Sequence, residues 1–132
     1  PDAKTNASIR RGSYVLPRET GDLKVIILAT GSEVEIATQA AERLGDGVRV
    51  VSLPSTHVFD QQSLEWRNAV LPNNVPMVSI EAGTTQGWHR YIGRDGIAIG
   101  LDSFGESAAA DVLYDHFGLT VDAVIAAVER IA

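Results

Sequence analysis

The stretch KVIILATGSEVEIATQAAERLGDGVRVVSL, from Lys24 to Leu53, decides the fold class of this chain. It opens with Lys24–Thr30, a β-branched and apolar run that is typical of a strand buried on both faces. Glu33–Leu44 then places alanines and leucine at helical spacing, and Gly45 suits the end of that helix. Val48–Leu53 is apolar again and predicts a second strand. A strand, a helix and a strand in this order form a right-handed crossover unit with parallel strands.

The rest of the chain continues to alternate between strands and helices. The patterns predict a short strand at Tyr14–Leu16, a helix capped by Asp60 that runs to about Val70, a strand at Met77–Ile80, a short helix around Trp88–Tyr91, a strand at Ile97–Leu101, a helix at Ala108–Phe117 that ends at Gly118, and a last helix capped by Thr120. The last helix carries an apolar stripe, which is expected to pack on the sheet. The sequence therefore predicts a three-layer α/β fold: a mostly parallel five-stranded sheet with helices on both faces and Tyr14–Leu16 as an antiparallel edge strand.

Length and composition indicate one folded domain and exclude several kinds of partner. The chain has 132 residues, of which 45% are apolar and 21% charged, close to the globular average. Residues 1–11 are polar and lack any period, so we interpret them as a linker from an upstream domain and residues 12–132 as a single α/β domain. The formal net charge of -6 disfavours binding to nucleic acid or to an anionic membrane surface. The absence of cysteine leaves the compartment open, and the cytoplasm is the default expectation.

Two glycine turns that follow predicted strands form a candidate anion site. The turn ATGSEVE leads from a strand into a helix, where free backbone amides can hold an anion. The turn at Phe104–Ser107 repeats this arrangement, so both turns could line one rim of the sheet. The alternative is helix capping, with Ser32 and Glu35 as a capping box and Ser107 as a second N-cap. The candidate anion-binding residues are Gly31, Ser32, Glu33, Gly105 and Ser107.

Two further patterns resemble catalytic signatures but lack the structural context that those signatures need. Gly45–Gly47 (GDG) and Asn73–Asn74 resemble the thiamine diphosphate and magnesium signature in letters and spacing. Both precede predicted strands, whereas the ligands of that signature come from strand ends, so we predict no metal site. Ser55 and His57 follow a strand and suggest a hydrolase, but the glycines that flank the nucleophile of a strained turn are missing. Glu81 ends another strand at the rim, and we interpret it as a hydrogen-bonding group of the loops.

Taken in order, these segments resemble the C-terminal domain of transketolase. The segments that carry the resemblance are ATGSEVE (29–35), VRVVSLPSTHVFDQQ (48–62), EAG (81–83), WHRYIG (88–93) and DSFGESAAADVLYDHFGLTVDAV (102–124). They agree with the family in order and spacing over nearly everything after Arg11. The FGESA block favours transketolase over related thiamine enzymes.

The resemblance implies a parent enzyme that moves two-carbon ketol units between sugar phosphates in the pentose phosphate pathway, with thiamine diphosphate and Mg²⁺ as cofactors. In that family the cofactors and the catalytic residues are held by upstream domains, so we expect no catalytic, cofactor-binding or metal-binding residue in this chain. The implied role is structural support of the upstream domains and of a homodimer. The alternative is a stand-alone α/β module that binds a small anion or phosphate at the rim of the sheet.

Overall fold

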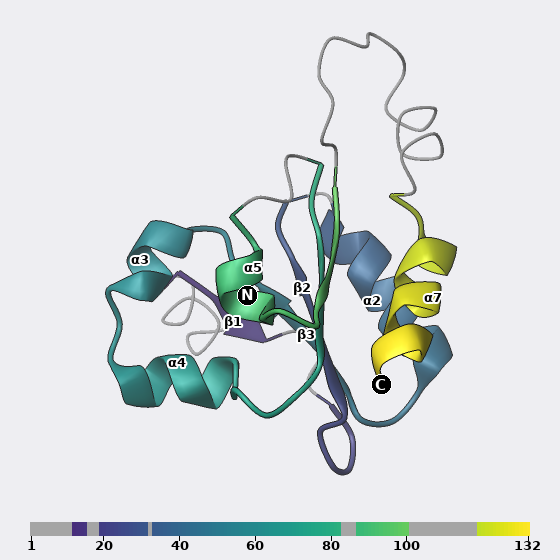
Figure 1. Ribbon diagram of the computed structural model, residues 1–132, viewed down its shortest axis with the longest axis horizontal. Helices are drawn as coiled ribbons and strands as arrows, with labels where there is room; N and C mark the ends of the chain where they lie inside the picture. The colour runs from purple at the N-terminus through teal and green to yellow at the C-terminus, as the bar shows by residue number, and fades with distance from the viewer. Residues whose placement is uncertain (1–11, 16–18, 32, 83–86, 101–118) are drawn as a thin grey trace, which may run out of the picture.

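A computed structural model describes residues 12–15, 19–31, 33–82, 87–100 and 119–132. Within these ranges the elements are, in chain order, β1 (Tyr14–Val15), β2 (Val25–Ala29), α2 (Glu33–Leu44), β3 (Val48–Ser52), α3 (Thr56–Asp60), α4 (Leu64–Val70), β4 (Met77–Ile80), α5 (His89–Ile92), β5 (Ile97–Ile99) and α7 (Val121–Ile131). Figure 1 shows a central sheet with α2 and α7 on one face and α3, α4 and α5 on the other. The predicted helix at Ala108–Phe117 lies outside the described residues. Within the described ranges, no helix has the length and apolar character needed to cross a membrane.

The sheet is built around β2, which lies between β3 and β4. Its strand order is β1-β3-β2-β4-β5, and the pairs β2 with β3, β2 with β4 and β4 with β5 are all parallel. β1 contributes two residues, which pair antiparallel with Val51 and Ser52 at the edge beyond β3. The predicted α/β fold with a parallel sheet is confirmed. Four of the strands form a regular parallel sheet. The antiparallel edge consists only of the two residues of β1 that pair with β3. Very short edge strands limit unwanted pairing with other chains.

The side chains of β2 alternate between two cores, because successive residues of a strand point to opposite faces. Val25 and Ile27 lie in the core beneath α2 and α7. Ile26 and Leu28 lie in the second core, which α3, α4 and α5 cover. All five residues of β2 are buried. Burial on both faces explains why the sequence of this strand has no polar alternation.

The last helix, α7, has the predicted cap and the predicted buried face. The Thr120 hydroxyl accepts the backbone N–H of Ala123 at 3.1 Å, which satisfies one of the free amides at the helix start. Val124 and Val128 are buried in the core between α7, α2 and the sheet, whereas Asp122 is exposed. The apolar stripe therefore holds α7 on the sheet, as the sequence predicts.

The predicted helix capped by Asp60 and running to about Val70 is confirmed at its end but wrong at its start, because α4 covers only Leu64–Val70 and Asp60 belongs to a separate helix, α3. Ser55 and Ser63 precede these helices in extended conformation, and each hydroxyl accepts a backbone N–H three residues further on, at 3.2 and 3.1 Å. Asp60 is the last residue of α3 and caps no helix. The chain divides here because a serine side chain competes with helical hydrogen bonding and starts a new helix instead.

Candidate functional site

The carboxyl ends of β2 and β4 form the place where an open α/β sheet usually binds its ligands. In the sheet, β3 lies on one side of β2 and β4 on the other. The chain runs from β2 to β3 and then returns past β2 to β4, so the strand order reverses between β2 and β4. Thr30 and Gly31 follow β2, and Glu81 and Ala82 follow β4. The sequence places its candidate anion site at this same rim.

The carboxylate of Glu33 lies between the ends of these two strands. Glu33 is the first residue of α2 and is only 4% exposed. Its Oε1 accepts the backbone N–H of Ala82 at 2.7 Å, which ties the start of α2 to the chain that leaves β4. The N–H of Glu33 donates to the carbonyl oxygen of Thr30 at 3.3 Å. A negative charge of the protein itself thus already complements the positive end of the α2 dipole.

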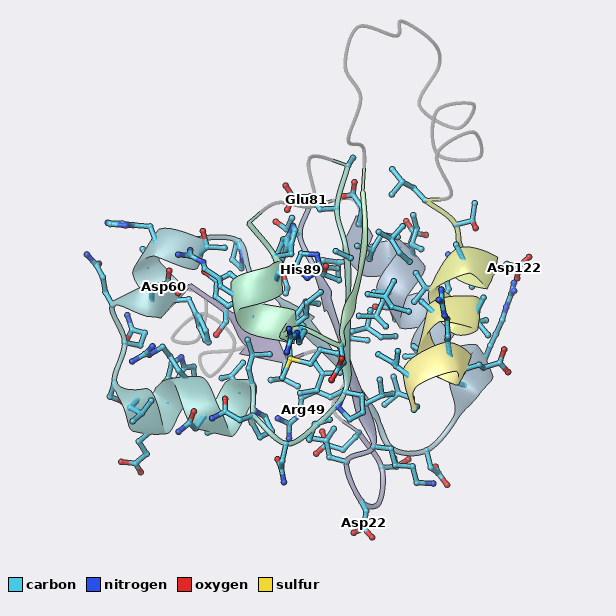
Figure 2. All side chains as sticks on the ribbon, viewed as in Figure 1. Asp22, Arg49, Asp60, Glu81, His89 and Asp122 are labelled. Atoms are coloured by element: carbon cyan, nitrogen blue, oxygen red, sulfur yellow. The ribbon has the colours of Figure 1, made fainter. Side chains whose placement is uncertain are left out.

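Glu81 adds a second carboxylate to the rim. Burial raises the pKa of Glu81; a hydrogen bond from the Trp88 side chain opposes this shift, and the negative charge of Glu33 adds to it. Figure 2 places Glu81 at one end of the sheet, opposite the end that holds Arg49. The bond to Trp88 agrees with the interpretation of Glu81 as a hydrogen-bonding group of the loops. Because like charges repel, the two carboxylates make this part of the rim unfavourable for a further anion.

Of the five candidate anion-binding residues, the structure describes Gly31 and Glu33. Gly31 is exposed and has a φ of 60°, so its left-handed backbone forms the turn between β2 and α2. Ser32, Gly105 and Ser107 lie outside the described residues. The anion site therefore stays a prediction, and its test must include the two carboxylates beside it.

Ser55 and His57, the pair that suggests a hydrolase, have separate structural roles. The Ser55 hydroxyl accepts the N–H of Val58 as the N-cap of α3. His57 is exposed, and its Nε2 lies 3.3 Å from the side-chain nitrogen of Gln61 on the next turn of the helix. In the part of the chain that the structure describes, no hydrogen bond links Ser55 to His57. The arrangement therefore lacks the contact through which a base activates a nucleophile.

Replacing Ser55 with alanine is expected to lower the free energy of unfolding by about 1 kcal/mol, the usual loss for an N-cap. Urea denaturation followed by circular dichroism measures this change. The matched variant Ser55→Asp keeps a capping acceptor and should stay within about 0.5 kcal/mol of the original chain. An alanine variant as stable as the original would show that the cap contributes nothing.

The residues that resemble the magnesium signature lie in two separate loops. Asp46 lies in the turn after α2, and its carboxylate accepts the hydroxyl of Thr20. Asn73 and Asn74 are exposed in the loop before β4. Over the described ranges, no three or more His, Cys, Asp or Glu side chains are grouped so that they could hold a metal ion.

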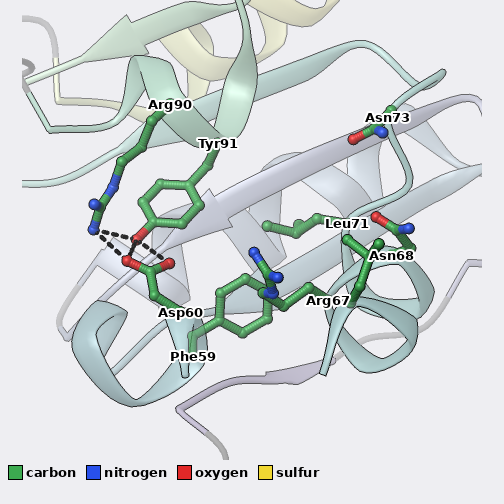
Figure 3. A pocket seen from close by; sticks show the side chains of 9 residues that line it. Phe59, Asp60, Arg67, Asn68, Leu71, Asn73, Arg90 and Tyr91 are labelled. Atoms are coloured by element: carbon green, nitrogen blue, oxygen red, sulfur yellow. Dashed lines mark hydrogen bonds and ion pairs between the residues drawn. The ribbon is translucent and has the colours of Figure 1, made fainter. Parts of the chain in front are cut away.

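A cluster of Asp60, Arg90 and Tyr91 joins α3 to α5, and the sequence analysis missed it. The Arg90 guanidinium lies 2.7 Å from the Asp60 carboxylate and donates to the Tyr91 hydroxyl at 2.6 Å (Figure 3). The Tyr91 hydroxyl donates to Asp60 at 2.9 Å. Burial raises the pKa of Tyr91, the bond to Asp60 and its charge raise it further, and Arg90 opposes these effects. No local pattern could reveal a contact between residues about thirty positions apart.

Comparison with known proteins identifies the family. The family model of the transketolase-like C-terminal domain matches residues 12–120. The chain belongs to this family. This match confirms the resemblance to the transketolase C-terminal domain that the sequence motifs indicated.

Individual relatives agree with this assignment. Transketolase of Physarum polycephalum is 52% identical over 120 residues, which are 90% of this chain and 18% of that protein. Transketolase 2 of Escherichia coli K12 is 47% identical over 127 residues, 93% of this chain and 19% of that protein. The structure of transketolase from Leishmania mexicana superposes with a TM-score of 0.84 at 40% identity and covers 95% of this chain and 19% of its own.

The transketolase C-terminal domain described here spans about one fifth of the length of the relatives that it matches. In those proteins the corresponding segment is part of a larger chain. This finding does not favour the alternative of a stand-alone module that binds a small anion or phosphate.

Proposed function

We propose that this chain serves as the C-terminal domain of a transketolase, a transferase that moves two-carbon ketol units between sugar phosphates in the pentose phosphate pathway. The observation that carries the proposal is the match of residues 12–120 to the domain family. The parent enzyme would use thiamine diphosphate and Mg²⁺, assemble as a homodimer and work in the cytoplasm. In this proposal the isolated domain is not catalytic.

The cofactors are assigned to upstream domains because, in the part of the chain that the structure describes, the residues that resemble the cofactor signature do not fit these groups. A magnesium ion bound to a diphosphate needs several oxygen ligands that converge on one point. Asp46 precedes β3 and Asn74 precedes β4, and β2 lies between these two strands. At the usual spacing between strands, the starts of β3 and β4 are therefore about 10 Å apart. The Asp46 carboxylate is also engaged by Thr20. We therefore derive no catalytic step in this chain.

The role that we assign to the domain is to fix the direction of the polypeptide that arrives from upstream. Residues 1–11 would act as the linker, a boundary that agrees with the start of the family match at residue 12. Ser13 is fully buried, and the adjacent β1 pairs with β3. Glu19 then forms a buried ion pair with Arg49 of β3 at 2.8 Å. These successive attachments make the start of the domain a rigid support for the domains before it.

Titration calorimetry of the chain with thiamine diphosphate and Mg²⁺ tests the assignment of the cofactors. We expect no saturable heat and an unchanged melting temperature, because a ligand of the native state must stabilise that state. A full-length transketolase serves as the positive control. Saturable binding that Asp46→Ala abolishes would place the cofactor on this chain and contradict the proposal.

A further inference from the structure

A cavity of about 370 Å³ opens between α3, α4 and α5, on the face of the sheet opposite α2 and α7. Its volume is in the range of small-molecule sites. Figure 3 shows the guanidinium of Arg67 between the Asp60, Arg90 and Tyr91 cluster and the side-chain amides of Asn68 and Asn73. All of these side chains line the cavity. Neither the family motifs nor the proposed cofactor assignment gives this cavity a role.

The charged groups of the cavity leave one positive charge in excess. Asp60 is the single carboxylate among the lining residues; it forms an ion pair with Arg90 at 2.7 Å and accepts a hydrogen bond from the Tyr91 hydroxyl. Arg67 uses its Nε to donate to the carbonyl oxygen of Gln62 at 3.2 Å. Within the described ranges, no group accepts a hydrogen bond from its two terminal nitrogens. The net charge of the whole chain is -6, so the excess positive charge in this cavity is opposite in sign to that of the chain.

Two amide side chains add hydrogen-bond donors that the protein itself does not use. Asn68 and Asn73 are exposed, and neither pairs with another group in the described part of the chain. Each amide carries two N–H donors, and a guanidinium presents its donors in a planar fork. The hydrogen-bond donors of these three side chains, Arg67, Asn68 and Asn73, therefore outnumber those that an anion with only two oxygens would need. A phosphate group has three acceptor oxygens and up to two negative charges at neutral pH.

Apolar and aromatic side chains also line the cavity. Leu71 and Phe59 are buried residues whose side chains line it. The ring of Tyr91 packs against Phe59 with ring centres 6.1 Å apart and against Trp88 at 5.9 Å. A lining of this kind can contact the carbon skeleton or the ring of a ligand without losing much side-chain freedom.

We propose that this cavity binds a small phosphate monoester, with the phosphate on Arg67, Asn68 and Asn73 and the organic part against Leu71 and Tyr91. The site is independent of the role proposed above, because its lining includes none of Ser13, Glu19 and Arg49, on which that role rests. Its chemistry is recognition, and no bond is made or broken.

Titration calorimetry of the chain with phenyl phosphate tests this site. We expect saturable one-to-one binding, weaker binding of inorganic phosphate and no binding of phenol. Arg67→Gln should weaken the Kd of phenyl phosphate by about tenfold or more, the size expected for a lost charge-assisted hydrogen bond. Asn68→Asp should weaken it as strongly, and this exposed side chain has no structural partner whose loss could unfold the chain.

Arg94→Gln is the matched control, since Arg94 is an exposed arginine that does not line the cavity. It should leave the Kd within about twofold of the original value. Three outcomes would overturn the proposal: no saturable binding of phenyl phosphate, binding that Asn68→Asp leaves unchanged, or equal affinity for benzoate, which would remove the preference for phosphate. Circular dichroism of each variant confirms that it is folded before the titration.

Discussion

Replacing Arg49 with methionine is expected to lower the free energy of unfolding by about 3–5 kcal/mol, the usual cost of removing one partner of a buried ion pair. Arg49 is 6% exposed. Its Nε and Nη2 each donate to the Glu19 carboxylate at 2.8 Å, and its Nη1 donates to the carbonyl oxygens of Ala69 and Val70 at 3.0 Å. Methionine fills part of the same space but donates no hydrogen bond. The Glu19 charge and the two carbonyl groups at the end of α4 would lose these donors.

Arg43→Met provides the matched control for this prediction, because the chemical change is the same at an exposed position. Arg43 lies 3.3 Å from Asp122, and the two side chains are 61% and 90% exposed. Solvent screens such a pair, so the expected loss is at most about 0.5 kcal/mol. Urea denaturation of both variants gives the comparison. If Arg49→Met were no more costly than Arg43→Met, the buried pair would not anchor the start of the domain.

The core of the fold could be predicted from the sequence because its signals are local. The apolar run of β2 specifies burial on both faces, and the spacing of alanines in α2 specifies the face that packs on it. Thr120 precedes an apolar stripe and thus predicts both the start and the buried side of α7. The division between α3 and α4 was missed because Ser63 is a weak signal in sequence, where a serine is as common on a helix surface as at a cap.

The polar contacts that organise the candidate sites could not be predicted in the same way. Arg49 reads as a charged residue within an apolar strand, and nothing near it indicates that Glu19, thirty residues earlier, supplies the partner. In the sequence, Glu33 belongs to the candidate anion site at the start of a helix. Its burial becomes visible only when β4 brings the N–H of Ala82 within 2.7 Å of it. Such contacts depend on the order of the strands, which the sequence pattern leaves open.

Replacing Gly12 with alanine is expected to lower the free energy of unfolding by about 2–5 kcal/mol, because two separate costs add. Gly12 has a φ of 86°, a region that costs a residue with a side chain about 1–2 kcal/mol. A Cβ atom at this position would lie 2.5 Å from the carbonyl oxygen of Ser55 and closer still to the backbone nitrogen of Phe59. Relief of such contacts requires the backbone to shift, which costs about 1–3 kcal/mol in a packed region.

The variant Gly21→Ala separates the two costs. Gly21 has a similar φ of 72°, but no atom lies within 4 Å of a Cβ placed there. It should therefore lose about 1 kcal/mol, since the backbone strain is partly offset by the lower entropy of the unfolded alanine chain. The difference between the two variants in urea denaturation measures the contact of the arriving chain with α3. Equal losses would mean that the cost at Gly12 is backbone strain alone, and that the backbone of α3 does not hold the start of the domain in place.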